Sequence, residues 1–410
     1  MKQPLFDILV VGGGHGGAQV AINLRQGGFT GSIAIVSDET EFPYERPPLS
    51  KEYFAGEKSV ERIRLRPPAF WDDKRISLIL GERVIEIDPA ARQVTTRTGS
   101  RLRYGKLVWA AGGSPRCLPL VGSGRDNVLC IRTLADADRL KALAEKAARV
   151  VVIGGGYIGL EAAAVLRKAG KQVVLLEVLD RVLARAAGAE LAHFVENYHR
   201  DRGVDVRLGT GVSALEGEGA IEAVRLSDGE RIACDLLIVG IGIVPAIEPL
   251  EAAGAACPNG VLVDRFCRTS LPDIFAVGDC AAHANVYAGS AVIRLESVQN
   301  AVDMAKTVSA TILGNAAAYE AVPWFWSHQF DLRIQTVGLS MGHDAAVLRG
   351  DPATGSFSVV YLKDGRVIAL DCVNATKDYT QGKALVVSGA QILPDILADA
   401  NRPLKELQPA

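Results

Sequence analysis

The chain has 410 residues, of which 49% are hydrophobic and 22% are charged. This length corresponds to roughly 2.7 domains of about 150 residues, enough for a large buried core, and the composition excludes a mainly disordered chain. The 45 basic and 47 acidic residues leave a formal net charge of −2. The basic excess that is typical of a nucleic-acid-binding protein is therefore absent.

The cysteines and the apolar segments exclude other classes of protein. No two of the seven cysteines form a C-x-x-C or C-x4-C pair, which disfavours a disulfide scaffold, a redox-active dithiol and a zinc site, so we predict no bound metal. Scattered thiols indicate a reducing compartment. Neither a signal peptide nor an apolar run of about 18 residues is recognisable, so we expect a cytoplasmic protein that does not enter a membrane.

A first glycine motif follows an apolar run near the N-terminus. Residues 8–11 predict a buried parallel strand, and the next glycines form the pattern G-x-G-x-x-G at Gly12, Gly14 and Gly17. These glycines permit a tight turn, close approach of a pyrophosphate and close packing of the next helix, whose N-terminus faces the phosphates. Asp38 lies 21 residues beyond Gly17, a spacing typical of an acid that binds ribose hydroxyls.

The same pattern recurs about 140 residues later in the chain. The sequence RVVVIGGGYIGL carries Gly154, Gly156 and Gly159, and the strand after the next helix ends at Glu177, 18 residues beyond Gly159. Two complete fingerprints are far more specific than one. They predict a tightly held flavin dinucleotide at the first motif and an exchangeable nicotinamide dinucleotide at the second.

The residues around the second motif bear on the choice of nicotinamide cofactor. The Glu177 carboxylate accepts hydrogen bonds from ribose hydroxyls and repels a 2′-phosphate, which favours NADH over NADPH. Arg181 and Arg185 weaken this preference; they lie on a solvated face or bind the pyrophosphate, and we count Arg185 and Gly242 among the NAD-binding residues. Tyr157, inside the motif, either stacks on or gates the nicotinamide, or packs against a neighbouring strand.

Further motifs resemble those of FAD-dependent ferredoxin reductases of the putidaredoxin reductase type, and the resemblance covers nearly the whole chain. The sequence RPPLSK begins at Arg46; in the family it runs beside the flavin, and its lysine pairs with a glutamate of the second glycine motif near flavin N5. The resemblance implies that Lys51 and Glu161 form this charge-assisted pair and orient the ring. It also places Arg46 and Pro47 at the FAD.

The resemblance implies four more FAD contacts along the chain. They are the backbone of Ala111 in VWAAGG, Arg132 in IRTLADAD, Asp279 in IFAVGD, and the backbone amide of Val298 at the helix N-terminus in RLESVQNA. Such a helix end favours negative charge on the reduced ring. Asp279 has a second interpretation as a helix N-cap.

The last motif, PWFWSHQF, resembles the sequence that opens the C-terminal interface domain of the family, and it places Trp326 among the FAD-binding residues. Where the family usually has an aspartate, this chain has His328. The residue either titrates near neutral pH or is buried and neutral. This departure puts in doubt any transfer of partner specificity from the family.

The order of the motifs predicts an α/β fold of the glutathione reductase type, with two Rossmann-like dinucleotide-binding domains and a C-terminal α+β domain. The predicted boundaries are 1–112 and 246–323 for a discontinuous FAD-binding domain, 113–245 for the NAD-binding domain and 324–410 for the interface domain. Residues 206–235 alternate between polar and apolar side chains, which indicates antiparallel strands. Short strands after residue 324 and helices near residues 381–388 and 394–400 complete the prediction.

These observations predict an NADH-dependent ferredoxin reductase. Hydride passes from NADH to N5 of FAD, and single electrons then pass to a separate [2Fe-2S] ferredoxin that serves a cytochrome P450 or a Rieske oxygenase, because the chain has no ligand set for a cluster. Arg294, Arg333 and Lys405 are candidates for the docking surface.

Three alternatives share parts of the pattern. A disulfide reductase and a cysteine-dependent NADH oxidase lack the cysteines that they require. A flavoprotein with a signalling or binding role, which resembles apoptosis-inducing factor, stays open as the alternative function.

Overall fold

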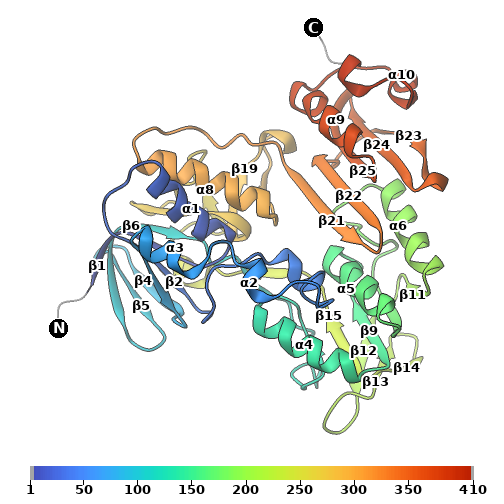
Figure 1. Ribbon diagram of the computed structural model, residues 1–410, viewed down its shortest axis with the longest axis horizontal. Coiled ribbons are helices and arrows are strands. Elements are labelled where there is room, and N and C mark those ends of the chain that lie inside the picture. The colour runs from blue at the N-terminus through green and yellow to red at the C-terminus, as the bar shows by residue number, and fades with distance from the viewer. Residues whose placement is uncertain (1–3, 408–410) are drawn as a thin grey trace. The chain divides into compact units, whose positions relative to one another are not determined.

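The computed structural model describes residues 4–407, which fall into two compact units (Figure 1). Unit 1 comprises Met1–Arg46, Ser59–Ser114 and Val244–Pro323, and unit 2 comprises Pro47–Lys58, Pro115–Ile243 and Trp324–Ala410. The units divide the chain differently from the three predicted domains, whose boundaries stay a prediction. The region that carries the second glycine motif and the C-terminal region share unit 2, which also contains most of the RPPLSK motif.

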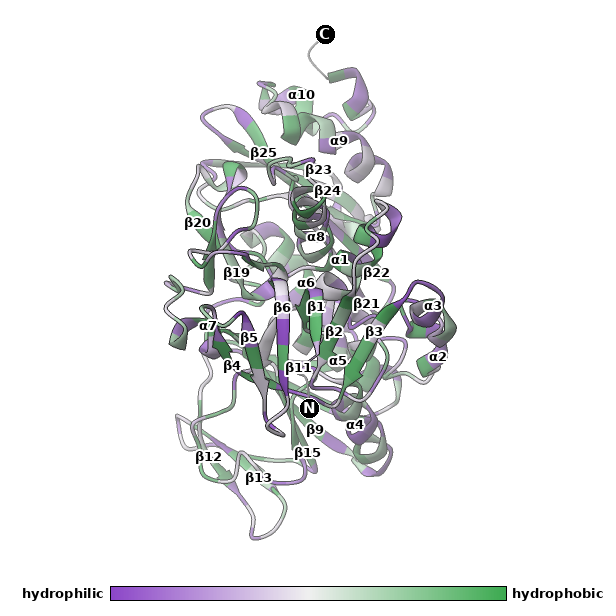
Figure 2. Ribbon diagram, turned by 90° about the vertical axis from the view of Figure 1, so that its left-hand side faces the viewer, coloured by the Kyte–Doolittle hydropathy of each residue, from purple (hydrophilic) through white to green (hydrophobic). Residues whose placement is uncertain are grey.

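Unit 1 is built around a parallel sheet in the order β3-β2-β1-β6, with β18 pairing alongside β6. The strands β1, β2 and β3 are apolar runs, and in Figure 2 β3 is coloured as hydrophobic. Leu9 and Val10 in β1 are fully buried, as expected for a strand covered on both faces. The parallel strands are β1 (Leu5–Val11), β2 (Ile33–Ser37), β3 (Ile76–Leu80), β6 (Arg101–Trp109) and β18 (Ile274–Ala276).

Helices and further strands complete unit 1. The helices α1 (His15–Gln26) and α8 (Val298–Ile312) contact each other along their length (Figure 1). The remaining helices of unit 1 are α2 (Val60–Ile63), α3 (Pro68–Asp73) and α7 (Glu248–Ala252), and the remaining strands are β4 (Val84–Asp88), β5 (Gln93–Thr96), β17 (Val261–Val263), β19 (Ala281–Ala284) and β20 (Val292–Arg294). Two of the five boundaries between the units fall within β7 (Gly113–Pro115) and β16 (Ile243–Pro245).

Unit 2 contains a second, fully parallel sheet in the order β11-β10-β9-β15-β8. Its strands are β8 (Val128–Leu129), β9 (Arg149–Ile153), β10 (Gln172–Leu176), β11 (Val204–Arg207) and β15 (Leu236–Val239), and its helices are α4 (Leu134–Lys146), α5 (Tyr157–Lys168) and α6 (Ala189–Asp201). The antiparallel strands predicted for residues 206–235 begin later, at β12, because Val206 lies in the parallel strand β11. They are β12 (Val212–Glu216), β13 (Ala223–Leu226) and β14 (Arg231–Ala233).

The C-terminal part of unit 2 is an antiparallel sheet in the order β21-β22-β25-β24-β23. The helix α9 (Thr376–Ser388) packs on one of its faces, and Gly382 of α9 lies against Leu370. On the opposite face, Phe357 contacts Phe194 of α6 with ring centroids 4.7 Å apart. The bounds are β21 (Trp324–Gln329), β22 (Leu332–Gly338), β23 (Ala345–Asp351), β24 (Ser356–Lys363), β25 (Arg366–Val373) and α10 (Pro394–Ala398).

Two histidines are buried in the fold, and burial lowers their pKa values. His199 on α6 is fully buried and hydrogen-bonded to Gln329 at 2.9 Å between Nε2 and Oε1, and His283 on β19 is 3% exposed. Burial lowers the pKa of each to about 4 from an ordinary value of 6.5. Both histidines are therefore neutral in the folded protein at neutral pH.

This difference in pKa predicts a loss of stability in acid. Between pH 6.5 and pH 4 the unfolded chain binds protons that the folded chain does not, so each histidine costs about 2 kcal/mol of folding free energy at pH 5 relative to pH 7.5. The His199→Gln variant should lose less of its thermal midpoint over this range than the wild type. The matched control is His193→Gln, an exposed histidine of the same helix; equal losses in all three proteins would contradict the assignment.

Candidate active site

The first glycine motif forms a turn that admits only glycine at two positions. Gly12 has a φ of +111°, and a Cβ there would lie 2.2 Å from the carbonyl oxygen of Ala110 and 3.0 Å from the amide nitrogen of Ala111. A Cβ at Gly17 would lie 2.0 Å from the carbonyl oxygen of Gly12. The turn thus holds β1, α1 and Ala111 together, and its shape fits the pyrophosphate of a dinucleotide.

The acid expected after β2 lies in an arrangement that sequence reasoning missed. The strand ends at Ser37, whose hydroxyl oxygen would lie 3.0 Å from a Cβ at Gly13. Asp38 follows and is exposed. Glu39 is instead held in place, because it accepts hydrogen bonds of 2.5 Å from both the Arg46 guanidinium and the Tyr44 hydroxyl. Two acids therefore stand at this strand end.

Arg46 links the glycine turn to a second part of unit 1. A Cβ at Gly14 would lie 3.8 Å from Nε of Arg46. Although burial lowers the pKa of Arg46, the groups of Tyr44, Glu39 and Asp279 raise it overall. The negative charge of Asp279 therefore acts on Arg46. Three of the predicted FAD residues, Gly14, Arg46 and Asp279, are thus linked in the structure.

Asp279 lies in a three-residue 3-10 helix, Gly278–Cys280, which packs against α8. The capping position of this short helix is Val277, so the interpretation of Asp279 as a helix N-cap is wrong. Val298 is the first residue of α8, as predicted, and the Ser297 hydroxyl accepts a hydrogen bond from the Asn300 amide. The N-terminal end of α8 therefore favours an anionic or polar ligand.

The second glycine motif repeats the geometry of the first in unit 2. Gly154 has a φ of +109°, and its Cβ would lie 2.3 Å from the carbonyl oxygen of Gly240. A Cβ at Gly159 would lie 2.1 Å from the carbonyl oxygen of Gly154. Gly156 precedes α5 directly and has open space beside it, so the helix N-terminus is accessible to a second dinucleotide.

Glu177, the first residue after β10, is equivalent to Ser37, the last residue of β2. The equivalence follows from the glycine turns, since the Gly154 amide donates to Leu176 and the Gly12 amide donates to Val36. The Glu177 carboxylate accepts hydrogen bonds from the amides of Gly155 and Leu179, at 2.6 and 2.9 Å. Its orientation is therefore fixed, while lone pairs remain for ribose hydroxyls.

The segment after Glu177, residues 178–188, is attached to the glycine turn. The Leu183 amide donates to the Gly155 carbonyl at 2.9 Å. The Arg181 guanidinium folds back on the segment and donates to the carbonyls of Ala187 and Ala184, so it supports the loop itself. Arg185 is exposed.

Gly242 lies on another part of unit 2. It has a φ of +97° and accepts a hydrogen bond of 2.9 Å from the Arg116 amide.

The pair implied by the RPPLSK resemblance is present and buried within unit 2. Nζ of Lys51 lies 2.9 Å from Oε1 of Glu161, and the two residues are 9% and 3% exposed. The hydroxyls of Ser50 and Ser327 each donate to the same carboxylate at 2.6 Å. Three donors from two distant segments thus compensate one buried negative charge.

The polar chain continues beyond the carboxylate. The Gln329 amide donates to the Ser327 hydroxyl at 3.2 Å, and its oxygen bonds His199. Sequence reasoning missed Ser50, Ser327, Gln329 and His199. The signal for the two serines was available, because each lies inside one of the motifs that carry the resemblance.

Tyr157, the first residue of α5, packs against Phe325 of β21 with ring centroids 4.6 Å apart. This contact favours the interpretation as packing against a neighbouring strand. Its buried hydroxyl has no hydrogen-bond partner. Burial, with the nearby carboxylates of Asp371 and Glu161, raises the pKa of Tyr157 well above its ordinary value, so the hydroxyl stays protonated.

Three further predicted FAD residues belong to unit 2. Pro47 opens the short 3-10 helix Pro47–Ser50, which contacts α4 and α5. Arg132 directly precedes Thr133, the capping residue of α4. Trp326 lies on β21, and its ring contacts those of Trp324 and Phe325. Their roles at a flavin stay predictions.

His328 is exposed, so its interpretation as a buried histidine is wrong. The covered part of the ring and the positive charges of Lys51 and Arg333 lower its pKa. The shift favours the neutral imidazole over the positive form at neutral pH.

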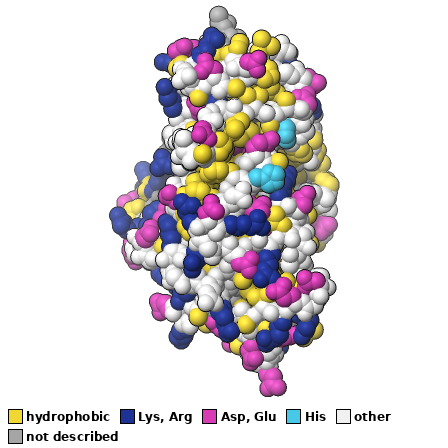
Figure 3. All heavy atoms as spheres, turned by 90° about the vertical axis from the view of Figure 1, so that its right-hand side faces the viewer, with side chains coloured by type: hydrophobic (Ala, Val, Ile, Leu, Met, Phe, Trp, Pro, Cys, Tyr) yellow, Lys and Arg dark blue, Asp and Glu magenta, His cyan; other side chains and the backbone are white. Residues whose placement is uncertain are grey.

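The predicted docking cations are not equally available. The Arg294 side chain is 10% exposed and lies 2.6 Å from Glu296, so it does not present a free charge. Arg333 and Lys405 are exposed. Figure 3 shows basic and acidic side chains interspersed on one face of the molecule, without a wide field of one sign.

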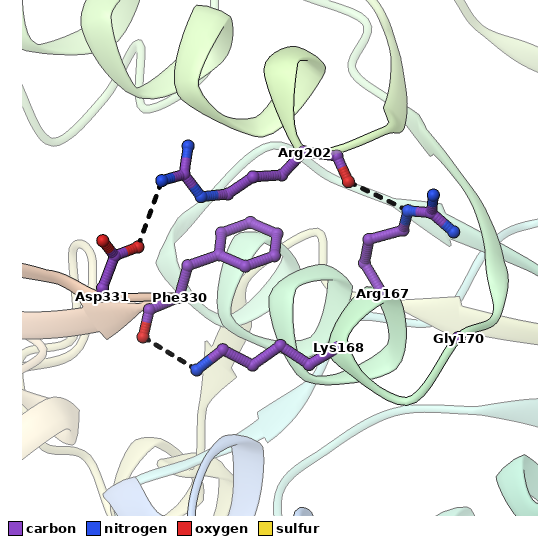
Figure 4. A pocket seen from close by; sticks show the side chains of 6 residues that line it. All are labelled: Arg167, Lys168, Gly170, Arg202, Phe330 and Asp331. Atoms are coloured by element: carbon purple, nitrogen blue, oxygen red, sulfur yellow. Dashed lines mark hydrogen bonds and ion pairs between the residues drawn. The ribbon is translucent and has the colours of Figure 1, made fainter.

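A basic cavity of about 450 Å³ lies where α5 and α6 end beside the β21–β22 turn (Figure 4). Its cations already have partners: Arg167 donates to the Arg202 carbonyl, Lys168 donates to the Phe330 carbonyl, and Arg202 lies 3.3 Å from Asp331. These contacts stabilise two helix C-termini. We therefore assign the cavity to the packing of the turn.

Among residues 4–407 no cluster of three or more His, Cys, Asp or Glu could hold a metal ion. The seven cysteines are all free thiols. Within the same range no helix combines the length and the apolar character needed to cross a membrane.

Two family models match the chain: "Pyridine nucleotide-disulphide oxidoreductase" over residues 6–305 and "Reductase C-terminal" over residues 324–408. The chain is 58% identical over 409 residues to the 5,5'-dehydrodivanillate O-demethylase ferredoxin reductase subunit of Sphingobium sp. (strain NBRC 103272 / SYK-6), with 99% of both sequences covered.

Two solved structures share the fold over nearly the whole chain. The ferredoxin reductase for the CYP199A2 system from Rhodopseudomonas palustris has a TM-score of 0.95 at 38% identity and covers 98% of this chain and 100% of its own. A chain of the covalent putidaredoxin reductase–putidaredoxin complex has a TM-score of 0.94 at 40% identity and covers 98% of this chain and 97% of its own.

The second glycine turn can be tested without disturbing the first. In Gly159→Ala the new Cβ meets the Gly154 carbonyl, so the turn must open, and we expect affinity for NAD+ to fall by at least about tenfold while flavin content stays unchanged. Calorimetry measures the dissociation constant, and absorbance measures the flavin. Gly124→Ala, at a glycine with open space around it, is the control. Unchanged NAD+ binding by Gly159→Ala would refute the assignment.

Proposed function

Because this chain belongs to the FAD-dependent ferredoxin reductases of the pyridine nucleotide-disulphide oxidoreductase family, we propose that it passes electrons from NADH to a [2Fe-2S] ferredoxin. The observation that carries the proposal is the buried Lys51–Glu161 pair, present in a chain with two glycine turns that fit dinucleotides. The protein works in the cytoplasm, in accord with its free thiols.

The names of the relatives support the partner and its place in an electron-transfer chain. One relative is the reductase subunit of an O-demethylase, one serves a CYP199A2 system, and one is joined covalently to putidaredoxin. The ferredoxin of this chain accordingly serves a cytochrome P450 or a Rieske oxygenase.

The FAD belongs at the first glycine turn, and bound FAD supplies the redox chemistry by accepting a hydride and releasing electrons singly. The turn and the start of α1 would hold its pyrophosphate, and the acids after β2, Asp38 and Glu39, would be available to its adenosine ribose. The remaining residues proposed to hold it are Gly12, Gly14, Gly17, Arg46, Pro47, Ala111, Arg132, Asp279, Val298 and Trp326.

NADH binds over the second glycine turn, at the N-terminus of α5. Glu177 is held by two backbone amides, so it cannot swing away from a 2′-phosphate, and the charge repulsion disfavours NADPH. The residues proposed to bind NADH are Gly154, Gly156, Tyr157, Gly159, Glu177, Arg185 and Gly242.

Lys51 and Glu161 act on the flavin as a pre-organised pair. The two serine hydroxyls fix the Glu161 carboxylate, and the carboxylate fixes Nζ of Lys51. Because the pair is almost fully covered, it needs no rearrangement of water to act. Its role is to hold one positive charge at a constant position; the hydride and the electrons belong to the cofactors.

The function is tested by anaerobic titration of the purified protein with NADH, followed by a ferredoxin-dependent assay of cytochrome c reduction. We expect bound flavin to bleach with about one equivalent of NADH and cytochrome c reduction to require added ferredoxin. Absence of flavin, or flavin that is not bleached, would overturn the proposal. A slow, long-lived charge-transfer species without turnover would favour the signalling alternative instead.

The role of the buried pair is tested by Lys51→Met, which keeps the length of the side chain and removes its charge. Flavin reduction by NADH in stopped flow should slow by at least about tenfold, since a pre-organised charge at the reacting ring is lost. Flavin content, read from the absorbance ratio, serves as the second readout.

The matched control is Lys58→Met, a more exposed lysine of the same segment that lies 3.5 Å from Glu52. This variant should reduce flavin at the wild-type rate. A Lys51→Met enzyme with full flavin and an unchanged reduction rate would remove the role that we assign to the pair.

A further inference from the structure

The segment of residues 178–188 is anchored at both ends. It follows Glu177, carries Arg181 and Arg185, and ends at Gly188, the residue that caps α6. Its middle is tied to the glycine turn through Leu183. Its far end contacts the C-terminal sheet, which contributes none of the glycine-motif residues.

The contact at the far end is close enough to require glycine. A Cβ at Gly188 would lie 2.3 Å from Oη and 2.5 Å from Cε1 of Tyr361. The φ of Gly188 is −68°, a value that any residue adopts, so close approach and not backbone conformation demands the glycine. Tyr361 is fully buried, and its ring therefore cannot move aside into solvent.

A buried carboxylate completes this contact. The Tyr361 hydroxyl donates to Oδ2 of Asp371 at 2.7 Å, and Asp371 is 4% exposed. Burial raises the pKa of Asp371 to about 6, although the Tyr361 hydroxyl and the Gly188 amide oppose the shift as hydrogen-bond donors; Glu190 and His343 are the other charged groups that act on it. At neutral pH the carboxylate is thus the acceptor for the Tyr361 hydroxyl.

The two faces of the C-terminal sheet pack against different helices. On strand β24, Ser358 points toward the face covered by α9, where its hydroxyl bonds Asp378 at 2.7 Å. Tyr361 and Phe357 alternate to the other face, which contacts α6. Asp371 pairs with Val359 on the neighbouring strand, so it is a diagonal neighbour of Tyr361.

The charge of the carboxylate also acts on the second glycine motif. Its charge reaches the hydroxyl of Tyr157, the buried hydroxyl that has no hydrogen-bond partner. Asp371 thus bonds Tyr361, which packs on Gly188, and its charge acts on Tyr157 in the first turn of α5. The 178–188 segment and this turn are the two parts of unit 2 proposed to bind NADH.

We propose that Tyr361 and Asp371 are positioning residues for the nicotinamide dinucleotide: the C-terminal domain fixes Gly188 through this pair and thereby holds the 178–188 segment in its nucleotide-binding form. The inference rests on the proposed NADH site. It gives the C-terminal sheet a task in cofactor affinity, in addition to any contact with the ferredoxin.

The test compares Tyr361→Phe and Asp371→Asn with the control Ser358→Ala, which removes a buried hydroxyl–carboxylate bond from the opposite face of the same strand. Loss of the pair should raise KM for NADH and the dissociation constant for NAD+ by about fivefold, the effect of one hydrogen bond. The kcat at saturating NADH and the flavin content should change by less than about twofold, since neither residue touches the flavin pair.

Limited digestion with trypsin gives a readout that does not depend on activity. Arg185 is exposed within the segment, and cleavage after it requires the segment to open locally. We expect faster cleavage at Arg185 in Tyr361→Phe and Asp371→Asn than in the wild type or Ser358→Ala, and protection when NAD+ is added.

The outcomes are separable. If wild-type protein binds no NAD+, the proposed function fails. If it binds NAD+ and the two variants match Ser358→Ala in affinity and cleavage, the positioning role fails while the proposed function stands. An equal fall in kcat and flavin content would show a general loss of structure and would also overturn the positioning role. Tyr361→Phe keeps the ring that packs on Gly188, so it decides the question if Asp371→Asn does not fold.

Discussion

The compensation of the Glu161 charge is the constraint on which unit 2 depends. A carboxylate with 3% exposure is stable in a protein interior only when charged and neutral donors satisfy it. Here the donors come from the segment Pro47–Lys58 and from β21, so α5, the RPPLSK motif and the C-terminal sheet must all be in place around one side chain. The fold and the site are therefore held by the same bonds.

The two glycine turns share one backbone geometry, although we propose a different ligand for each. Both place a carbonyl about 2 Å from the site of a missing Cβ, so glycine is required at equivalent positions. They differ at the strand end, where Ser37 stands in one and Glu177 in the other. A carboxylate fixed by two amides defines the second site, whereas the first draws its acids from one and two residues further along. In our proposal the two turns therefore differ in specificity because of the end of the neighbouring strand.

Much of the fold could be predicted, because parallel strands and glycine turns leave a local signature in the sequence. The parallel strands β1 and β9, the start of α8 at Val298 and the Lys51–Glu161 pair were all expected. The partners of Glu161 were missed, since contacts between residues 50, 161 and 327 have no periodicity. Of the two interpretations left open for His328, the buried one was wrong, because this strand residue faces solvent. Of those for Asp279, the helix N-cap was wrong, because the short helix begins one residue earlier and is capped by Val277. Tyr361 and Asp371 gave no signal, because their importance comes only from what they touch.

The path of the chain between the two units has a consequence for biosynthesis. The chain leaves unit 1 after Arg46, returns at Ser59, leaves again after Ser114 and returns at Val244, so neither unit is a contiguous stretch. During translation unit 1 receives its last residues at Pro323, whereas unit 2 still lacks the whole C-terminal sheet and hence the Ser327 hydroxyl. The contacts of the RPPLSK motif in the nascent chain therefore stay incomplete until the C-terminal sheet has left the ribosome.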